Sequence, residues 1–403
     1  MATTSRPGEV RDAVVGAVPD RVFEPVSADE CAEVMAREGG RIAFIGGGTE
    51  LALGGAPGAL DAVVRTGRMS RILEYAPADM VLIAEAGVTL AQVQAVARQE
   101  GQMLALDPPL PERATLGGLV ATGGFGPRRA RYGAIRDLIL GVALVRADGV
   151  LARGGGKVVK NVAGFDLPKL LCGSLGTLGL IAEATFRLHP LPEASATAMC
   201  AGLTAAQVVA LMADARQAQL EPSSGVALRG GGGFDLGIRF DGFAAGVREQ
   251  VTRMGAIARA AGLSCEIVAD DAAARRRHDQ ARVAGPLRVK LTALPARLAE
   301  VDALLAPVLA ALAGGSFAWY PSLGIGFAGG EVADEAAASA ALAVARAGLV
   351  AAGGSLVVEA APPGLRSIDP WGPPPPAFAL MTALKQRFDP DGRLNPGRFV
   401  GGL

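Results

Sequence analysis

The stretch VVKNVAGFDLPKLLCGSLGTLGLIAEATFRL, residues 158–188, decides how the first half of the chain folds. It ends in an alternation of apolar and polar residues that is typical of a strand, and glycines at 173, 176 and 179 precede that strand. Packing requires the leucines but not these glycines. Because glycine has no Cβ, its backbone can approach another group closely. The stretch therefore predicts a strand at whose entry another group closely approaches the backbone.

Two further glycine-bearing segments lie in the same half of the chain, IGGGTELALGG at 45–55 and ATLGGLVATGGFG at 114–126. Successive N–H groups in such loops can bind one anion. Thr115 is expected to cap a helix whose free first-turn N–H groups attract negative charge, by about 0.3–1 kcal/mol per interaction. A pyrophosphate is an anion that these N–H groups could bind together. The alternative that each loop is only a tight turn remains open, and the segments match neither the Rossmann fingerprint nor a P-loop.

Composition limits the function classes. With 403 residues, two or three domains are expected, and the 39 basic residues equal the 39 acidic ones, which excludes bulk attraction to nucleic acid or acidic lipid. The most apolar helical stretch, 301–313, is shorter than the ~20 residues of a membrane span, and the first residues lack the apolar run of a secretory signal. The four cysteines form no CxxC and no metal-like group with the two histidines, which indicates a reducing cytoplasm and no bound metal.

The order of predicted elements indicates an α+β fold in four parts. Residues 1–20 read as an N-terminal tail, and helices capped at Ser27 and Thr89 alternate with strands in a domain over 21–192. Asp148-Gly149 predicts a hairpin. Residues 193–361 predict a second α+β domain, an antiparallel sheet with helices on one face. Residues 362–403 contain a proline-rich connector, a helix near 377–388 and a turn-rich C-terminal tail.

Four motifs in this order carry a resemblance to a known family: FIGGGTEL (44–51), PPLPERATLGGLVATGGFGPRRARYGAIRDLILG (108–141), KNVAGFDLPKLLCGSLGTLGLIAEATFRLHPLP (160–192) and DPDGRLNPGR (389–398). They resemble the vanillyl-alcohol oxidase/PCMH-type FAD-binding superfamily and, more narrowly, the FAD-binding subunits of bacterial glycolate oxidase (glycolate dehydrogenase). The resemblance is dense over about 20–192 and the last ten residues. It implies a two-part PCMH-type FAD-binding domain followed by a reduced antiparallel α+β cap domain.

The resemblance also implies which residues contact FAD. The first loop would cradle the pyrophosphate, the second segment would flank the pyrophosphate and flavin, and the third would contact the nucleotide end. The implied residues are Gly46, Gly47, Gly48 and Thr49, then Thr115, Gly117, Gly118, Ala121, Thr122 and Gly124, then Gly176, Thr177, Gly179 and Ile181. Relatives often hold FAD covalently through a histidine near the first loop, and this loop has none, so FAD is expected to be non-covalent.

The chemistry beyond cofactor binding stays open at this level, and no catalytic residue is assigned. Lys157 or Lys160 would either balance charge on the flavin or lie exposed at a strand end. Arg128, Arg129, Arg131 and Arg136, with Tyr132, would bind a carboxylate, meet a partner or pair with surface acids. The run around His278 reads as a solvated helix face rather than a catalytic base. Asn395 would lie near the flavin ring or belong to a structural clasp.

The resemblance implies a subunit of a complex that oxidises glycolate to glyoxylate and relays the electrons. Its partners would be a second flavoprotein subunit and an iron–sulfur subunit, with the complex in the cytoplasm or peripheral to the inner membrane through those partners. Two alternatives remain: an independent FAD-dependent dehydrogenase of 2-hydroxy acids or alcohols, and a non-enzymatic assembly subunit with a vestigial flavin site.

Overall fold

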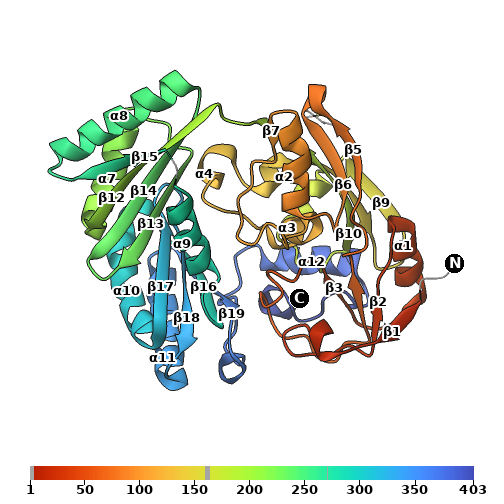
Figure 1. Ribbon diagram of the computed structural model, residues 1–403. Coiled ribbons are helices and arrows are strands. Elements are labelled where there is room, and N and C mark those ends of the chain that lie inside the picture. The colour runs from red at the N-terminus through yellow and green to blue at the C-terminus, as the bar shows by residue number, and fades with distance from the viewer. Residues whose placement is uncertain (1–3, 159–163, 270) are drawn as a thin grey trace. The chain divides into compact units, whose positions relative to one another are not determined.

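The computed structural model describes residues 4–158, 164–269 and 271–403, which fold into two compact units. The first unit comprises residues 1–126, 133–191 and 373–403, and the second comprises 127–132 and 192–372. Both contain helices and sheets, and the second is built on a wholly antiparallel sheet, so the α+β fold is confirmed (Figure 1). No described helix is long and apolar enough to span a bilayer.

The first unit contains a four-stranded sheet with the order β1 (Ser5–Pro7), β2 (Arg21–Phe23), β4 (Ala62–Arg65), β3 (Ile42–Ile45). Strand β1 pairs antiparallel with β2, whereas β4 runs parallel to both its neighbours. The prediction of a loose tail over residues 1–20 is wrong for the described part of that segment. Asp12 is fully buried and binds Arg6 at 2.7 Å and Arg65 at 2.8 Å. These ion pairs fix the segment to the sheet.

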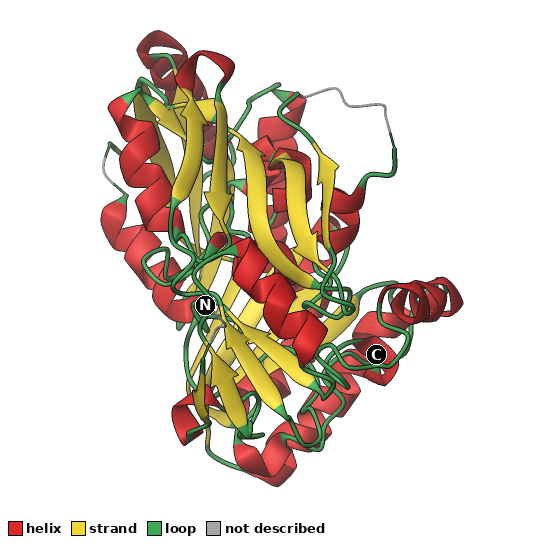
Figure 2. Cartoon of the chain, turned by 90° about the vertical axis from the view of Figure 1, so that its right-hand side faces the viewer, coloured by secondary structure: helices red, strands yellow, loops and turns green. Residues whose placement is uncertain are grey.

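The same unit contains a five-stranded antiparallel sheet with the order β5 (Ile72–Ala76), β6 (Val81–Glu85), β10 (Leu180–Arg187), β8 (Ile139–Val145), β9 (Leu151–Gly155). Strand β10, at the apolar end of the stretch 158–188, is central. Helix α1 (Ala28–Arg37) contributes Cys31, Val34 and Met35 to a core that also contains residues of both sheets. One face of this helix therefore packs on a core that residues of both sheets share, and Figure 2 views this side of the molecule.

Short elements connect and complete the first unit. They are η1 (Val10–Asp12), η2 (Pro77–Asp79), α2 (Leu90–Gln99), β7 (Gln102–Met103), α3 (Leu116–Thr122), α5 (Ile135–Leu138), α6 (Leu167–Leu171), β11 (His189–Pro190), α12 (Phe378–Phe388) and η5 (Val400–Gly402). The C-terminal tail, residues 389–403, returns to the four-stranded sheet. Ile42 donates to the Arg393 carbonyl at 2.8 Å, and Asn395 donates to the Ile42 carbonyl at 2.8 Å. The tail thus extends the edge next to β3.

The second unit is built on an eight-stranded antiparallel sheet. Its order is β15 (Cys265–Val268), β12 (Ala194–Leu203), β14 (Gly233–Gly242), β13 (Ser224–Gly230), β17 (Leu312–Tyr320), β18 (Ile325–Val332), β16 (Leu287–Thr292), β19 (Ser355–Ala360). The short elements α4 (Arg129–Tyr132), η3 (Pro295–Arg297) and η4 (Pro363–Leu365) also belong to it. A disulfide joins Cys200 on β12 to Cys265 on β15, so this pair departs from the expected reduced state.

Four long helices of the described chain pack on one face of this sheet, and α9 packs on the other (Figure 1). The four are α7 (Ala205–Gln217), α8 (Ala244–Ala260), α10 (Leu298–Ala310) and α11 (Glu335–Ala351), and their buried side chains share one core with Trp319. Neighbouring strand residues face opposite sides. Accordingly, Tyr320 contacts α9 (Ala272–Arg282) on the other face.

Candidate functional site

The three glycine-bearing segments meet at one pocket of the first unit, here called the glycine hollow. The first segment contributes Gly46 to Leu51, the second contributes residues of α3, and the third contributes Leu175. The described lining is Phe44, Gly46, Gly47, Gly48, Thr49, Glu50, Leu51, Thr115, Gly118, Ala121, Thr122, Leu175, Asn395 and Arg398. Eight of the fourteen residues predicted to bind the cofactor are therefore brought together.

The first loop leaves hydrogen-bond donors unused. Strand β3 ends at Ile45, and Gly48 turns the chain with a φ of +74°, a conformation that side chains disfavour. A Cβ on Gly48 would meet nothing within 4 Å, so the space beside it is open. Within the described ranges, the N–H groups of Gly48 and Thr49 donate no hydrogen bond. Two unused donors beside open space are suited to an anion.

Gly46 and Gly47 have a different role from Gly48. A Cβ on Gly46 would overlap the Thr115 hydroxyl, and one on Gly47 would overlap the Arg113 carbonyl. These two glycines allow the first loop to pack against the start of α3. The Thr115 hydroxyl then accepts hydrogen bonds from Gly47 and from Gly118, both at 3.3 Å. Thr115 therefore caps α3 as predicted and also anchors the loop.

The N–H groups at the start of α3 are not free, which differs from the expectation. Leu116 donates to the Val88 carbonyl and Gly117 to the Ala86 carbonyl, both at 2.8 Å. Gly118 donates to Thr115, so the first turn is already occupied by protein acceptors. A Cβ on Gly118, in contrast, would meet only the Thr115 hydroxyl, at 3.0 Å. Gly118 thus offers space, while the donors come from the first loop.

Six predicted residues lie outside the described lining. They are Gly117, Gly124, Gly176, Thr177, Gly179 and Ile181. Gly117 and Gly179 allow close packing against Ala86 and Leu144, respectively. The Thr177 hydroxyl is buried and donates to the Ser174 carbonyl at 2.7 Å. A Cβ at 176 would likewise meet the side chains of Asn395 and Phe44, so protein side chains lie against the glycines at 176 and 179.

Two residues of the C-terminal tail complete the hollow. The Asn395 side chain accepts a hydrogen bond from the Phe44 N–H at 3.4 Å, and a Cβ on Gly176 would lie 2.6 Å from its amide nitrogen. Arg398 is buried and donates to the carbonyls of Leu51 at 2.8 Å and Leu53 at 2.6 Å. Burial lowers the pKa of Arg398 to about 10, so it is still charged at neutral pH. Arg398 brings positive charge to the lining.

Lys385 joins the third segment to the tail. Its buried ammonium donates to the Thr177 carbonyl at 2.9 Å, to the Leu394 carbonyl at 2.8 Å and to Asp389 at 2.6 Å. Burial lowers the pKa of Lys385, and its hydrogen bond to Asp389 opposes that shift. One side chain on α12 thus fixes both segments next to the residues that line the hollow.

The other charged candidates lie outside the glycine hollow. Lys157 is exposed and pairs with Glu74 at 2.5 Å, and Lys160 lies outside the described residues. Arg131 pairs with Glu221 in the second unit at 3.3 Å. Arg136 is exposed, while Arg128, Arg129 and Tyr132 each have interactions within the protein. The described residues contain no group of three or more His, Cys, Asp or Glu that could hold a metal.

The interpretation of the run around His278 as a solvated face is wrong for the side of α9 that carries His278 and Arg282. Both are buried, and both bind the Tyr320 hydroxyl, His278 at 2.6 Å and Arg282 at 2.9 Å. The Arg282 guanidinium also lies 3.5 Å from the centre of the Phe327 ring. These four residues, here called the α9 cluster, are a packed polar core. The i, i+4 spacing of His278 and Arg282 was the available signal.

Comparison with known proteins agrees with the geometry of the hollow. Residues 19–155 match the family model described as "FAD binding domain". The chain carries an FAD binding domain. This segment includes the first two glycine-bearing segments and α3, and the cofactor of the chain is FAD.

Individual relatives are similar over part of their length. Glycolate oxidase subunit GlcE of Escherichia coli K12 is 43% identical over 125 residues, which is 31% of this chain and 36% of that protein. Subunit GlcD of Bacillus subtilis is 35% identical over 184 residues, 45% of this chain and 39% of that protein. A D-lactate dehydrogenase of Archaeoglobus fulgidus is 39% identical over 174 residues, which is 42% of this chain and 38% of that protein. The chain therefore spans less than two-fifths of each relative.

Solved structures of alkyldihydroxyacetonephosphate synthase share the fold. The alignment with one of them covers 96% of this chain and 78% of the synthase chain, with a TM-score of 0.70 and 18% identity. A second covers 93% and 76%, with a TM-score of 0.69 and the same identity. The likeness covers residues of both units, so the fold of an α+β unit followed by a second α+β unit is confirmed.

The residues of the glycine hollow fit FAD. Gly48 and Gly118 leave space that a Cβ would occupy, two backbone donors are unused in the described ranges, and Arg398 supplies positive charge. These three features favour the binding of a diphosphate. The described lining holds no histidine or cysteine to which a flavin could be covalently attached.

Proposed function

We propose that this chain is the FAD-binding subunit of a glycolate-oxidase-type complex and takes part in the oxidation of glycolate to glyoxylate. The observation that carries the proposal is the glycine hollow, because its unused N–H groups and Arg398 fit a diphosphate within a domain that matches an FAD family. The similarity to two glycolate oxidase subunits supports the choice of substrate.

In this proposal, the N–H groups of Gly48 and Thr49 bind the diphosphate and Arg398 offsets its charge. Thr115 and Lys385 hold the loops and the tail in position. FAD, when bound, accepts the two electrons that leave the hydroxy acid. The cofactor is held non-covalently. The chain works with a second flavoprotein subunit and an iron–sulfur subunit, in the cytoplasm or at the inner membrane through those partners.

The test is to express the chain with its neighbouring subunits, purify the assembly, and count flavin and iron per chain. We expect FAD that is released by denaturation, together with glycolate-dependent reduction of an artificial acceptor by the assembly. Loss of that activity on omitting this chain, and its return on adding the FAD-loaded chain, would support the role. A purified chain that takes up no FAD would contradict it and favour a non-enzymatic assembly role.

A second candidate is an independent FAD-dependent dehydrogenase of 2-hydroxy acids. The similarity to a D-lactate dehydrogenase over 42% of the chain favours it. Turnover separates the two candidates: the FAD-loaded chain alone would reduce an artificial acceptor with D-lactate or glycolate if it were independent. Flavin that is reduced only when the partner subunits are present would exclude this candidate.

A further inference from the structure

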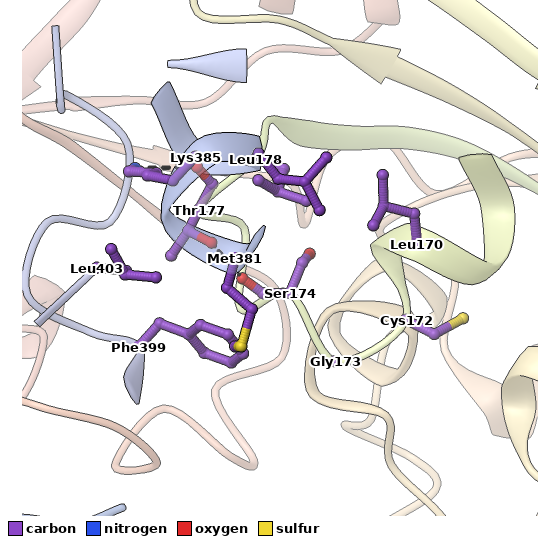
Figure 3. Close-up of a pocket in the computed structure, with 11 residues that line it drawn as sticks. Leu170, Cys172, Gly173, Ser174, Thr177, Leu178, Met381, Lys385, Phe399 and Leu403 are labelled. Atoms are coloured by element: carbon purple, nitrogen blue, oxygen red, sulfur yellow. Dashed lines mark hydrogen bonds between the residues drawn. The ribbon is translucent and has the colours of Figure 1, made fainter. Parts of the chain in front are cut away.

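A second cavity lies in the same unit, beside the loop that leads into β10 (Figure 3). Its lining residues come from three places: 170, 172–174, 177 and 178 in and after α6, residues of helix α12, and the end of the tail. It shares no lining residue with the glycine hollow. Residues of one loop nevertheless line both pockets: Leu175 lines the hollow, and Ser174 and Thr177 line the second cavity.

The lining of the second cavity is mainly apolar. Leu170 and Leu178 form one part, Met381 and Leu384 come from α12, and Phe399 and Leu403 come from the tail. On α12 the usual pattern is reversed, because the charged Lys385 is buried while Met381 and Leu384 stay partly exposed to the cavity. An apolar ligand that covers these side chains removes them from water, which lowers the free energy of the complex.

The charges beside the cavity are already matched. Lys385 donates to two carbonyls and to Asp389, so the three protons of its ammonium are all used. Asp389 is fully buried and also accepts from the N–H groups of Arg393 and Leu394, at 3.0 and 2.8 Å. The cavity therefore offers no net charge to a ligand, and a neutral molecule fits it better than an acid or an amine.

One polar side chain in the lining lacks a partner. The Ser174 hydroxyl is buried, with 6% of the residue exposed, and it has no hydrogen-bond partner among the described residues. The other short polar side chains of the lining are engaged, since Thr177 donates to the Ser174 carbonyl and Cys172 to the Pro168 carbonyl. A buried hydroxyl without a partner is destabilising. A ligand in the cavity that offers one hydrogen-bonding atom to Ser174 would remove that cost.

We propose that this cavity is a second ligand site, which binds a neutral, mainly apolar small molecule whose single carbonyl oxygen accepts a hydrogen bond from Ser174. The apolar walls cover the body of the molecule and Ser174 fixes its orientation. The site is distinct from the one that holds FAD. This inference stands apart from the proposed function, since it requires neither glycolate nor the partner subunits.

The probes are acetophenone, which carries one carbonyl on an apolar body, and ethylbenzene, a hydrocarbon of nearly the same size. Binding of each is measured by ligand-observed NMR and calorimetry on the full chain, with and without FAD. We expect acetophenone to bind more tightly than ethylbenzene by roughly 2- to 10-fold, the effect of one neutral hydrogen bond. Added FAD should leave both affinities unchanged.

Variants assign the binding to this cavity. Ser174→Ala should remove the difference between the two probes, whereas Ser355→Ala should not, because that hydroxyl pairs with Thr292 at 2.8 Å in the second unit. Met381→Trp should fill the cavity and abolish binding of both probes, and Leu384→Phe provides a milder blocking variant if Met381→Trp does not fold.

Three results would overturn the proposal. Equal binding by the blocked variant would place the probes elsewhere on the protein. Displacement of acetophenone by FAD would make the cavity part of the cofactor site. Absence of any binding would mean that water alone satisfies Ser174. Failure of the chain to bind FAD is a separate result, which would affect the proposed function and not this site.

Discussion

The glycine hollow and the α9 cluster differ in whether the hydrogen-bonding groups of the protein are already paired. In the α9 cluster, His278 and Arg282 both bind the Tyr320 hydroxyl, and Arg282 stacks on Phe327. In the hollow, Gly48 and Thr49 leave their N–H groups unused within the described ranges. A polar group without an internal partner can bind a ligand at no cost to the fold. The free donors are what support the proposal that the hollow is the binding site, whereas the contacts of the cluster stabilise the second unit.

The largest effect is expected from Gly118→Val, which fills the hollow where only the Thr115 hydroxyl is near. The affinity for FAD should fall by roughly 100-fold or more, because the side chain occupies the space of the diphosphate. Absorbance of the folded variant after gel filtration gives the FAD content per chain.

The matched control for this variant is Gly246→Val, a helical glycine of α8 with nothing within 4 Å of its Cβ position. It should keep the FAD content of the parent chain. A folded Gly118→Val protein that stays as yellow as the control would remove Gly118 from the site.

The next largest effect on FAD affinity is expected at Arg398 but not at Arg393, although both arginines of the tail donate to backbone carbonyls. Arg398 lines the hollow, whereas Arg393 donates to the carbonyls of Gly40, Ala147 and Met35. Arg398→Gln should weaken FAD binding by about 10- to 100-fold, since a charge near the diphosphate is lost. Fluorescence titration at low and high salt measures this, because the salt dependence should shrink with the charge.

Arg393→Gln should instead lower the melting temperature and change the FAD dissociation constant by less than about twofold. If the two variants weakened FAD equally, Arg398 would belong to the clasp of the tail alone and would not bind the cofactor.

Tyr320→Phe should lower the stability of the chain without changing its affinity for FAD. Removing the hydroxyl leaves His278 and Arg282 buried without their shared partner, which should lower the free energy of unfolding by about 1–3 kcal/mol. Urea unfolding and FAD titration on the same samples check both halves of the prediction. A loss of FAD affinity with unchanged stability would give the α9 cluster a ligand-binding role.

The same cluster predicts a pH dependence. Burial, with the nearby charge of Arg282, lowers the pKa of His278 below its ordinary 6.5. The unfolded chain therefore binds more protons than the folded one between the two pKa values, and stability falls as pH drops from 6.5 toward the lowered value. Replacing His278 with Gln should flatten this acid limb in thermal unfolding across pH 5–8. An unchanged slope would mean that His278 does not titrate as its surroundings require.

The smallest effect is expected from Lys157→Met. Its partner Glu74 is exposed, and exposed ion pairs contribute about 0–1 kcal/mol. FAD affinity and the flavin reduction potential should both stay at the values of the parent chain. A clear shift of the potential would revive the possibility that Lys157 offsets charge on the flavin.

Local signals were the part of the fold that sequence could predict. Ser27, Thr89 and Thr115 cap α1, α2 and α3, and Asp148-Gly149 forms the turn between β8 and β9. Each depends on residues only a few positions apart. The formation of strand β10 also followed from the alternation of its residues, although the strand is buried along nearly its whole length.

Long-range contacts were the part that sequence could not predict. The first-turn N–H groups of α3 are taken by Val88 and Ala86, more than twenty residues away along the chain. Arg398 reaches the hollow from the end of the chain, and the disulfide joins cysteines separated by 65 positions. Nothing in the local pattern distinguishes Arg398 from Arg393, because only the folded positions of their carbonyl partners do so.

The central claim is that main-chain N–H groups of the first loop, with Arg398, bind the diphosphate of FAD. A crystal structure of the chain with FAD tests it most directly. The account predicts diphosphate oxygens at hydrogen-bond distance, about 2.7–3.2 Å, from the nitrogens of Gly48 and Thr49. A structure in which side chains fill the hollow and FAD binds elsewhere would contradict it.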